Sequence, residues 1–109
     1  MGTIDGGANS IPPDLRTIYK HDFERSVDLF QSSLQEYEKA KEFNKKKKFK
    51  DVMDKALQIM NETASACLSK KSITEKDQLQ KDYQNFLQHD TPNTLKRLND
   101  DLDQLKKSL

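Results

Sequence analysis

The amino-acid sequence predicts an all-α protein, a small antiparallel bundle of four helices of unequal length. One reason is where the helix breakers lie: all three glycines fall within the first seven residues, and the prolines are Pro12, Pro13 and Pro92. Another is that residues 14–91 contain neither glycine nor proline and are rich in Lys, Glu, Gln, Asp and Leu. Tight turns between strands depend on glycine, asparagine and proline, so this long stretch favours helices over sheet.

The composition indicates a folded chain with a thin apolar core. Apolar residues make up 33% of the 109 residues, against roughly 45–50% in an ordinary globular domain. Charged residues make up 34%, but the net charge is only +1, which argues against a self-repelling disordered chain. We therefore expect a flexible, disordered tail over residues 1–12 and one helical domain over 13–109. A second copy or a partner is expected to complete its core.

No segment predicts a membrane or secreted location. The apolar runs are far shorter than the ~20 residues that span a bilayer, and the N-terminus lacks the basic and apolar regions of a secretory signal. The single cysteine, Cys67, cannot form an internal disulfide. We expect a cytoplasmic protein without a transmembrane segment.

A first helix is predicted over residues 13–43. Apolar side chains recur there every three or four residues, which places them on one helical face. The stripe consists of Leu15, Ile18, Tyr19, Phe23, Val27, Phe30, Leu34 and Tyr37. A helix of this length, roughly 45 Å, can extend beyond the others. Its aromatic residues are therefore candidates for a partner-binding surface: Tyr19, Phe23, Phe30 and Tyr37.

A second helix is predicted over residues 49–70, after a loop. When the first stripe is continued by steps of three and four, it reaches polar residues such as Asn44 and Lys48, so the helical phase is interrupted. The second apolar face consists of Phe49, Val52, Met53, Ala56, Leu57, Met60, Ala64, Cys67 and Leu68. Leu57 and Met60 lie in the middle of this face and are predicted to be central core residues.

A third helix is predicted over residues 73–89. Ser72 and Glu75 match the capping box, in which the serine hydroxyl accepts from the third amide and the glutamate reaches back. Its apolar residues are Ile73, Leu79, Tyr83, Phe86 and Leu87.

A fourth helix is predicted over residues 92–108, capped by Asp90 or Thr91, with Pro92 in its first turn. Its apolar residues are leucines at heptad a and d positions, as in a coiled coil: Leu95, Leu98, Leu102, Leu105 and Leu109. So short a seam is not stable alone. We expect it to pack inside its own bundle, and packing against another chain is the alternative.

The most charged segment is a run of five lysines, Lys45, Lys46, Lys47, Lys48 and Lys50. Basic segments attract nucleic-acid phosphates or acidic lipid headgroups through electrostatics alone. The run has no glycine loop, aromatic platform or arginine with which to read bases, and Asp51 and Asp54 follow closely. We expect a solvated loop between helices, and anion binding is the alternative.

Residues that catalyse reactions or bind metals are sparse. Neither His21 nor His89 has the spacing of a zinc motif. Cys67 has no histidine nearby in sequence, which favours a packed, unreactive thiol. The acidic segment 100–103 lacks the glycine and distant glutamate of an EF-hand loop. We predict no catalytic residue, no metal site and no cofactor.

The sequence is most typical of a non-enzymatic protein-interaction module of the adaptor, chaperone or regulator type. Such a module would bind a protein partner or a second copy through apolar helix faces, with Leu95, Leu98, Leu102 and Leu105 among the contacts. The alternative is binding of an anionic surface, nucleic acid or acidic lipid through the lysine run. Affinity that falls steeply with salt would favour the alternative.

Overall fold

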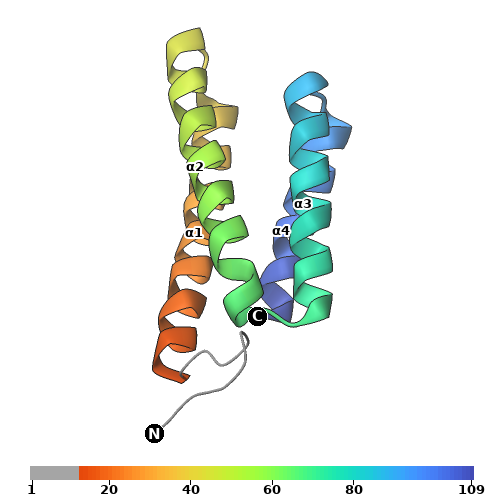
Figure 1. Cartoon of the computed structure of the whole chain (residues 1–109). Coiled ribbons are helices and arrows are strands. Elements are labelled where there is room, and N and C mark those ends of the chain that lie inside the picture. Colours follow the sequence, from red (N-terminus) through yellow and green to blue (C-terminus); the bar gives the residue numbers. More distant parts are fainter. Residues whose placement is uncertain (1–12) are drawn as a thin grey trace, which may run out of the picture.

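The computed structural model describes residues 13–109, which form four α-helices (Figure 1). The helices are α1 (Pro13–Lys39), α2 (Phe43–Cys67), α3 (Lys70–Gln88) and α4 (Pro92–Ser108). No strand occurs in this part of the chain, so the predicted all-α helical bundle is confirmed. The predicted tail, residues 1–12, lies outside the described residues. None of the four helices is long and apolar enough to cross a membrane.

The helices are arranged as two hairpins. α1 packs along α2 and α3 along α4, while fewer contacts join α1 to α4 and α2 to α3. In Figure 1 the chain reverses direction at each connection, so the α1–α2 and α3–α4 connections lie at one end of the molecule. The α2–α3 connection lies at the other end. The α1–α2 hairpin extends beyond the α3–α4 hairpin, and its connection therefore projects from the molecule.

One apolar core joins the two hairpins. Its largest fully buried side chains come from all four helices: Tyr83, Phe23, Phe30, Phe86, Leu34, Met53, Met60, Leu79, Leu98, Leu102, Leu105 and Val27. The rings of Phe30 and Tyr83 meet edge to face with 5.1 Å between centroids, and those of Tyr37 and Phe86 do so at 5.7 Å. Both contacts connect α1 with α3, so aromatic packing holds the hairpins together.

The core predictions are confirmed. Leu57 and Met60 are buried in the middle of α2. The leucine seam of α4 packs inside the chain, because Leu98, Leu102 and Leu105 have no exposed surface.

The break between the first two helices lies earlier than predicted. α1 ends at Lys39 instead of residue 43, and α2 begins at Phe43 instead of residue 49. The lysine run therefore forms the first turns of α2, and the prediction of a loop there is wrong. Lysine has a high helix propensity, and the change of phase requires only the three residues 40–42.

The second and third helices also meet at different residues than predicted. α2 ends at Cys67 instead of residue 70, and α3 begins at Lys70 instead of residue 73. The N-cap is Ser69, whose hydroxyl oxygen accepts a hydrogen bond from the Ser72 amide at 3.2 Å. Ser72, the predicted cap, is a buried residue of the first turn whose Oγ lies 3.0 Å from Oγ of Ser108. That contact links the start of α3 to the end of α4.

The start of α4 matches the prediction. Thr91 is the N-cap, with its hydroxyl oxygen accepting from the Thr94 amide at 3.2 Å, and Pro92 lies in the first turn.

Candidate functional site

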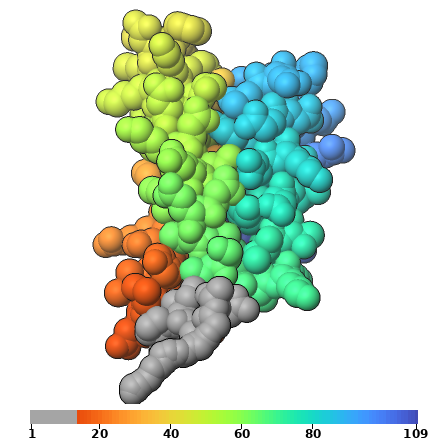
Figure 2. All heavy atoms as spheres, viewed as in Figure 1, coloured from red at the N-terminus to blue at the C-terminus, as the bar shows by residue number. Residues whose placement is uncertain are grey.

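The end of the α1–α2 hairpin concentrates positive charge. Residues 39–50 contain seven lysines and one glutamate. This end projects beyond the α3–α4 hairpin (Figure 1, Figure 2). We define the hairpin tip as its exposed basic and aromatic side chains: Lys39, Lys41, Phe43, Lys45, Lys47 and Lys48.

Phe43 is the most exposed large apolar side chain in residues 13–109, with 79% of its surface accessible. Phe43 is the first residue of α2, and the first buried residue of that helix is Met53. Phe43 therefore lies outside the core. Sequence reasoning did not single it out, because it placed Phe43 at the end of the first helix and not at the start of α2.

Two lysines of the predicted run are held by the bundle. Lys46 Nζ donates to the Tyr37 carbonyl at 3.2 Å and lies 4.3 Å from the centroid of the Tyr37 ring. Lys50 Nζ pairs with Asp54 Oδ2 at 3.0 Å, and this hydrogen bond raises the pKa of Lys50. Asp54 also accepts from the Tyr83 hydroxyl at 2.6 Å. Lys46 therefore connects α2 to α1, and Lys50 pairs with the Asp54 carboxylate that accepts from Tyr83 of α3.

The other three lysines of the run are free to contact a ligand. Lys45, Lys47 and Lys48 are exposed, and none forms an ion pair with a described residue. A hollow of about 350 Å³ on this surface is lined by Asn44, Lys47, Lys48, Asp51, Val52 and Lys55. Its three amines outweigh the single carboxylate of Asp51, so the hollow favours an anion.

The protein does little to neutralise this charge. Glu42 occupies the N-cap position of α2 without a capping hydrogen bond, and the first turn contains no acidic residue. Lysines near a helix N-terminus are unfavourable, because that end of the helix dipole is itself positive. The charge at the hairpin tip therefore remains available to an external anion.

The apolar candidates for a partner surface lie mostly inside the molecule. Phe23 and Phe30 are fully buried, and so are Leu98, Leu102 and Leu105. A partner could reach these five side chains only if the bundle opened.

The remaining three apolar candidates are half-buried. Tyr37 and Leu95 pack against the core, and Tyr19 lies nearer the start of α1. The structure therefore brings most of the predicted interaction residues together as core and not as a surface.

A different set of apolar side chains is exposed on α1. Leu15, Ile18 and Leu29 have 39%, 54% and 43% of their surface accessible. At 100° per residue, the three positions fall within about 60° of the helix circumference. We call these three residues the α1 stripe.

A buried carboxyl pair joins α3 to α4. Asp82 is 7% exposed and accepts a hydrogen bond from Gln78 Nε2 at 3.2 Å. Oδ2 of Asp101 is buried, and no donor from residues 13–109 reaches it. Burial and the neighbouring Asp82 raise the pKa of Asp101 to about 7, while hydrogen bonding to Asp101 lowers the pKa of Asp82. The pair therefore keeps one proton, on Asp101, at pH values well above those at which an aspartate usually loses it.

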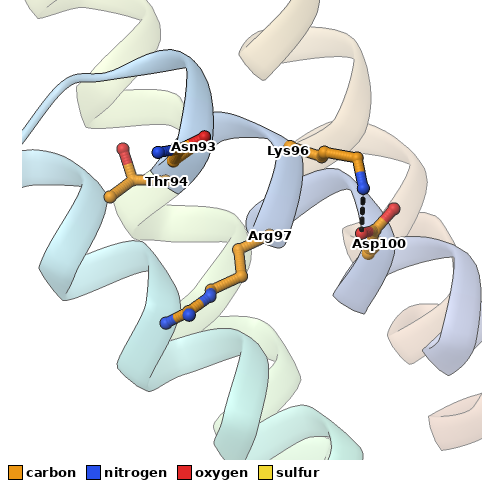
Figure 3. A pocket seen from close by; sticks show the side chains of 5 residues that line it. All are labelled: Asn93, Thr94, Lys96, Arg97 and Asp100. Atoms are coloured by element: carbon orange, nitrogen blue, oxygen red, sulfur yellow. Dashed lines mark ion pairs between the residues drawn. The ribbon is translucent and has the colours of Figure 1, made fainter.

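A second hollow, lined by polar side chains, lies on α4. It has a volume of about 410 Å³ and is lined by Asn93, Thr94, Lys96, Arg97 and Asp100 (Figure 3). Lys96 and Asp100 pair with each other at 3.7 Å, and Arg97 extends from α4 toward α3. Across the described helices, no group of three or more His, Cys, Asp or Glu side chains is placed to hold a metal ion.

The cysteine and histidines have structural surroundings. The Cys67 thiol donates to the Thr63 carbonyl at 3.2 Å, and burial raises the pKa of this thiol. A raised pKa leaves less of the reactive thiolate. His21 is exposed with its ring 4.0 Å from Glu24, and His89 is the C-cap of α3.

Comparison of the chain with protein-family models, curated proteins and solved structures finds no match.

Proposed function

We propose that this chain is a non-enzymatic binding module that attaches to an anionic, phosphate-bearing surface through its hairpin tip. The observation that carries the proposal is the exposure of Lys45, Lys47 and Lys48, unpaired within the described chain, in the same first turns of α2 as the exposed ring of Phe43. The tip also projects beyond the α3–α4 hairpin at its end of the molecule (Figure 1).

The charge distribution supports an oriented encounter. Residues 39–50 carry a charge of +6 and the whole chain carries +1, so the rest of the chain carries −5. An anionic surface attracts the tip and repels the remainder, which steers the hairpin end toward it. The low net charge therefore does not weaken the proposal.

The expected strength is modest. A lysine close to an acidic surface contributes about 1 kcal/mol, so the five lysines of the tip contribute about 5 kcal/mol together. This corresponds to a dissociation constant of roughly 0.2 mM. Such binding weakens as salt screens the charges.

Long-chain inorganic polyphosphate is a suitable first probe, because it presents phosphate without bases or acyl chains. We expect the triple substitution Lys45→Gln, Lys47→Gln and Lys48→Gln to lower the affinity for polyphosphate by at least about tenfold. Fluorescence anisotropy at low and physiological salt measures this affinity.

The matched control removes the same charge from α3, through Lys70→Gln, Lys71→Gln and Lys81→Gln. These three lysines are exposed, and the first two begin α3 at the opposite end of the molecule from the tip (Figure 1). We expect less than a twofold loss. Equal losses in the two variants, or no binding by the unaltered chain, would contradict the proposal.

The α1 stripe favours a second candidate function, a protein-interaction module. Three large apolar side chains on one side of α1 remain exposed, and such surfaces often mark contacts between proteins. If the partner is a second copy, light scattering across a concentration series should show a dimer that Leu29→Glu converts to a monomer. An unchanged monomeric mass in both proteins would leave self-association without support.

A further inference from the structure

We infer that the anionic surface is a lipid bilayer containing acidic headgroups, into which Phe43 inserts as the lysines of the hairpin tip contact the phosphates. The inference rests on the proposed function and specifies its partner. It follows from the position of one aromatic ring among the tip lysines.

Phe43 has the position expected of an inserting residue. It is the first residue of α2, 79% exposed, and follows a connection of only three residues from the end of α1. Lys41 precedes it by two residues and Lys45 follows it by two, so the ring lies between ammonium groups along the chain. Removing such a ring from water is favourable, and the bilayer interface provides apolar surroundings beside the anions.

The lysine side chains suit the same surface. Their aliphatic stems can lie along the apolar boundary while the ammonium groups remain at the level of the headgroups. A lysine recognises a phosphate as a point charge and needs no fixed geometry. The tip can therefore bind a fluid array of headgroups.

The same features fit nucleic acid less well. Binding of single strands uses several aromatic rings on which successive bases stack, often with arginine. Residues 39–50 contain no arginine, and their two aromatic side chains differ greatly in exposure. Phe43 is exposed, whereas Phe49 is half-buried. A single ring offers a stacking position for one base.

The shape of the molecule allows this contact. The α3–α4 hairpin ends short of the α1–α2 hairpin at this end of the molecule (Figure 1, Figure 2). The tip can therefore reach a bilayer before α3 or α4 does. Because the rest of the chain carries a net charge of −5, an acidic surface also repels it.

The test compares vesicles of phosphatidylcholine with vesicles in which about one third of the lipid is phosphatidylserine. We expect the chain to sediment with the acidic vesicles, and Phe43→Ser to weaken this binding by about tenfold. Affinity for polyphosphate should change by less than twofold, because polyphosphate has no apolar layer. The matched control is Ile59→Ser, which removes another exposed apolar side chain from α2, sixteen residues after Phe43 and outside the α1 stripe, and should leave both affinities unchanged.

A second variant reports insertion directly. The chain contains no tryptophan, so Phe43→Trp introduces a single fluorophore at the tip. We expect its emission to shift to shorter wavelength with acidic vesicles and to become protected from a water-soluble quencher. Circular dichroism checks that each variant keeps its helices.

Three results would overturn the inference. They are full vesicle affinity in Phe43→Ser, an unshifted and fully quenched tryptophan signal from Phe43→Trp on vesicles, and tighter binding to a single-stranded oligonucleotide than to acidic vesicles. In each case, retained polyphosphate binding that depends on the tip lysines would leave the proposed function standing. Loss of that binding would remove both.

Discussion

The Tyr83 hydroxyl donates a hydrogen bond to the Asp54 carboxylate at 2.6 Å, and this contact connects α3 to α2. The Tyr83 ring is fully buried and packs edge to face on Phe30 of α1. Burial, and then the hydrogen bond to Asp54, raise the pKa of Tyr83. One side chain thus joins three helices across the boundary between the two hairpins.

Tyr83→Phe should lower the free energy of unfolding by about 1.5–3 kcal/mol, because it removes a hydrogen bond to a charged group and keeps the ring. Urea denaturation followed by circular dichroism measures the change. Tyr83→Ala should cost more, about 3–5 kcal/mol, because the ring is also lost. If Tyr83→Phe had no effect, the hydroxyl would not stabilise the α2–α3 contact.

The carboxyl pair of Asp82 and Asp101 should make stability depend on pH. The folded-state pKa of Asp101 is about 7, above its ordinary value of 3.8. The folded state therefore binds this proton more tightly, and stability should rise as pH falls from 8 to 5. Asp82 acts in the opposite direction, because its folded-state pKa is lowered. Its contribution is present above pH 3.8 and is lost as pH falls through its lower folded-state pKa.

Urea midpoints at pH 8, 6.5 and 5 test the upper part of this dependence. Asp101→Asn should flatten it, because the amide is neutral at every pH and can still donate to Asp82. Asp103→Asn is the control: its carboxylate is exposed and is not among the groups that raise the pKa of Asp101. We expect the stability of the control to change with pH as it does in the unaltered chain. A slope that persists in Asp101→Asn would assign the titration to another group.

Helical periodicity was sufficient to predict much of the fold. The steps of three and four in α4 identified Leu98, Leu102 and Leu105 as one face, and the structure buries all three. Thr91 and Pro92 marked the start of that helix because their chemistry suits only its first positions. These signals are local and need no knowledge of the other helices.

The hairpin tip is harder to predict, because its own residues do not determine where the helix break lies. No glycine or proline marks the break at residues 40–42, and lysine is compatible with either helix or loop. The sequence predicts that the second helix begins at residue 49, six residues later than it does, and therefore does not predict that Phe43 is exposed. The approach of Asp82 and Asp101 depends on how α3 packs against α4, which residue spacing within one helix does not determine.

Leu102→Asp should unfold the chain, because it places a charge without a partner in the core. The expected loss is about 4 kcal/mol or more, a large part of the ~5–15 kcal/mol typical of natural domains. Gln104→Asp introduces the same charge on an exposed position of α4 and should change stability little. Thermal melts by circular dichroism distinguish the two, and a cooperative Leu102→Asp melt at the original temperature would contradict the burial of the seam.

Lys48→Pro tests whether the lysine run is helical. Within α2 a proline at this position loses an amide hydrogen bond and clashes with the preceding turn, which costs about 3 kcal/mol or more. In a solvated loop the same change would be nearly neutral. Lys48→Gln is the control: it keeps helix propensity and removes a positive charge near the positive end of the helix dipole, so its stability should be unchanged or slightly raised. Urea denaturation should therefore give free energies of unfolding that differ by at least ~3 kcal/mol between the two variants. Similar midpoints would indicate that the lysine run is a loop and not a helix.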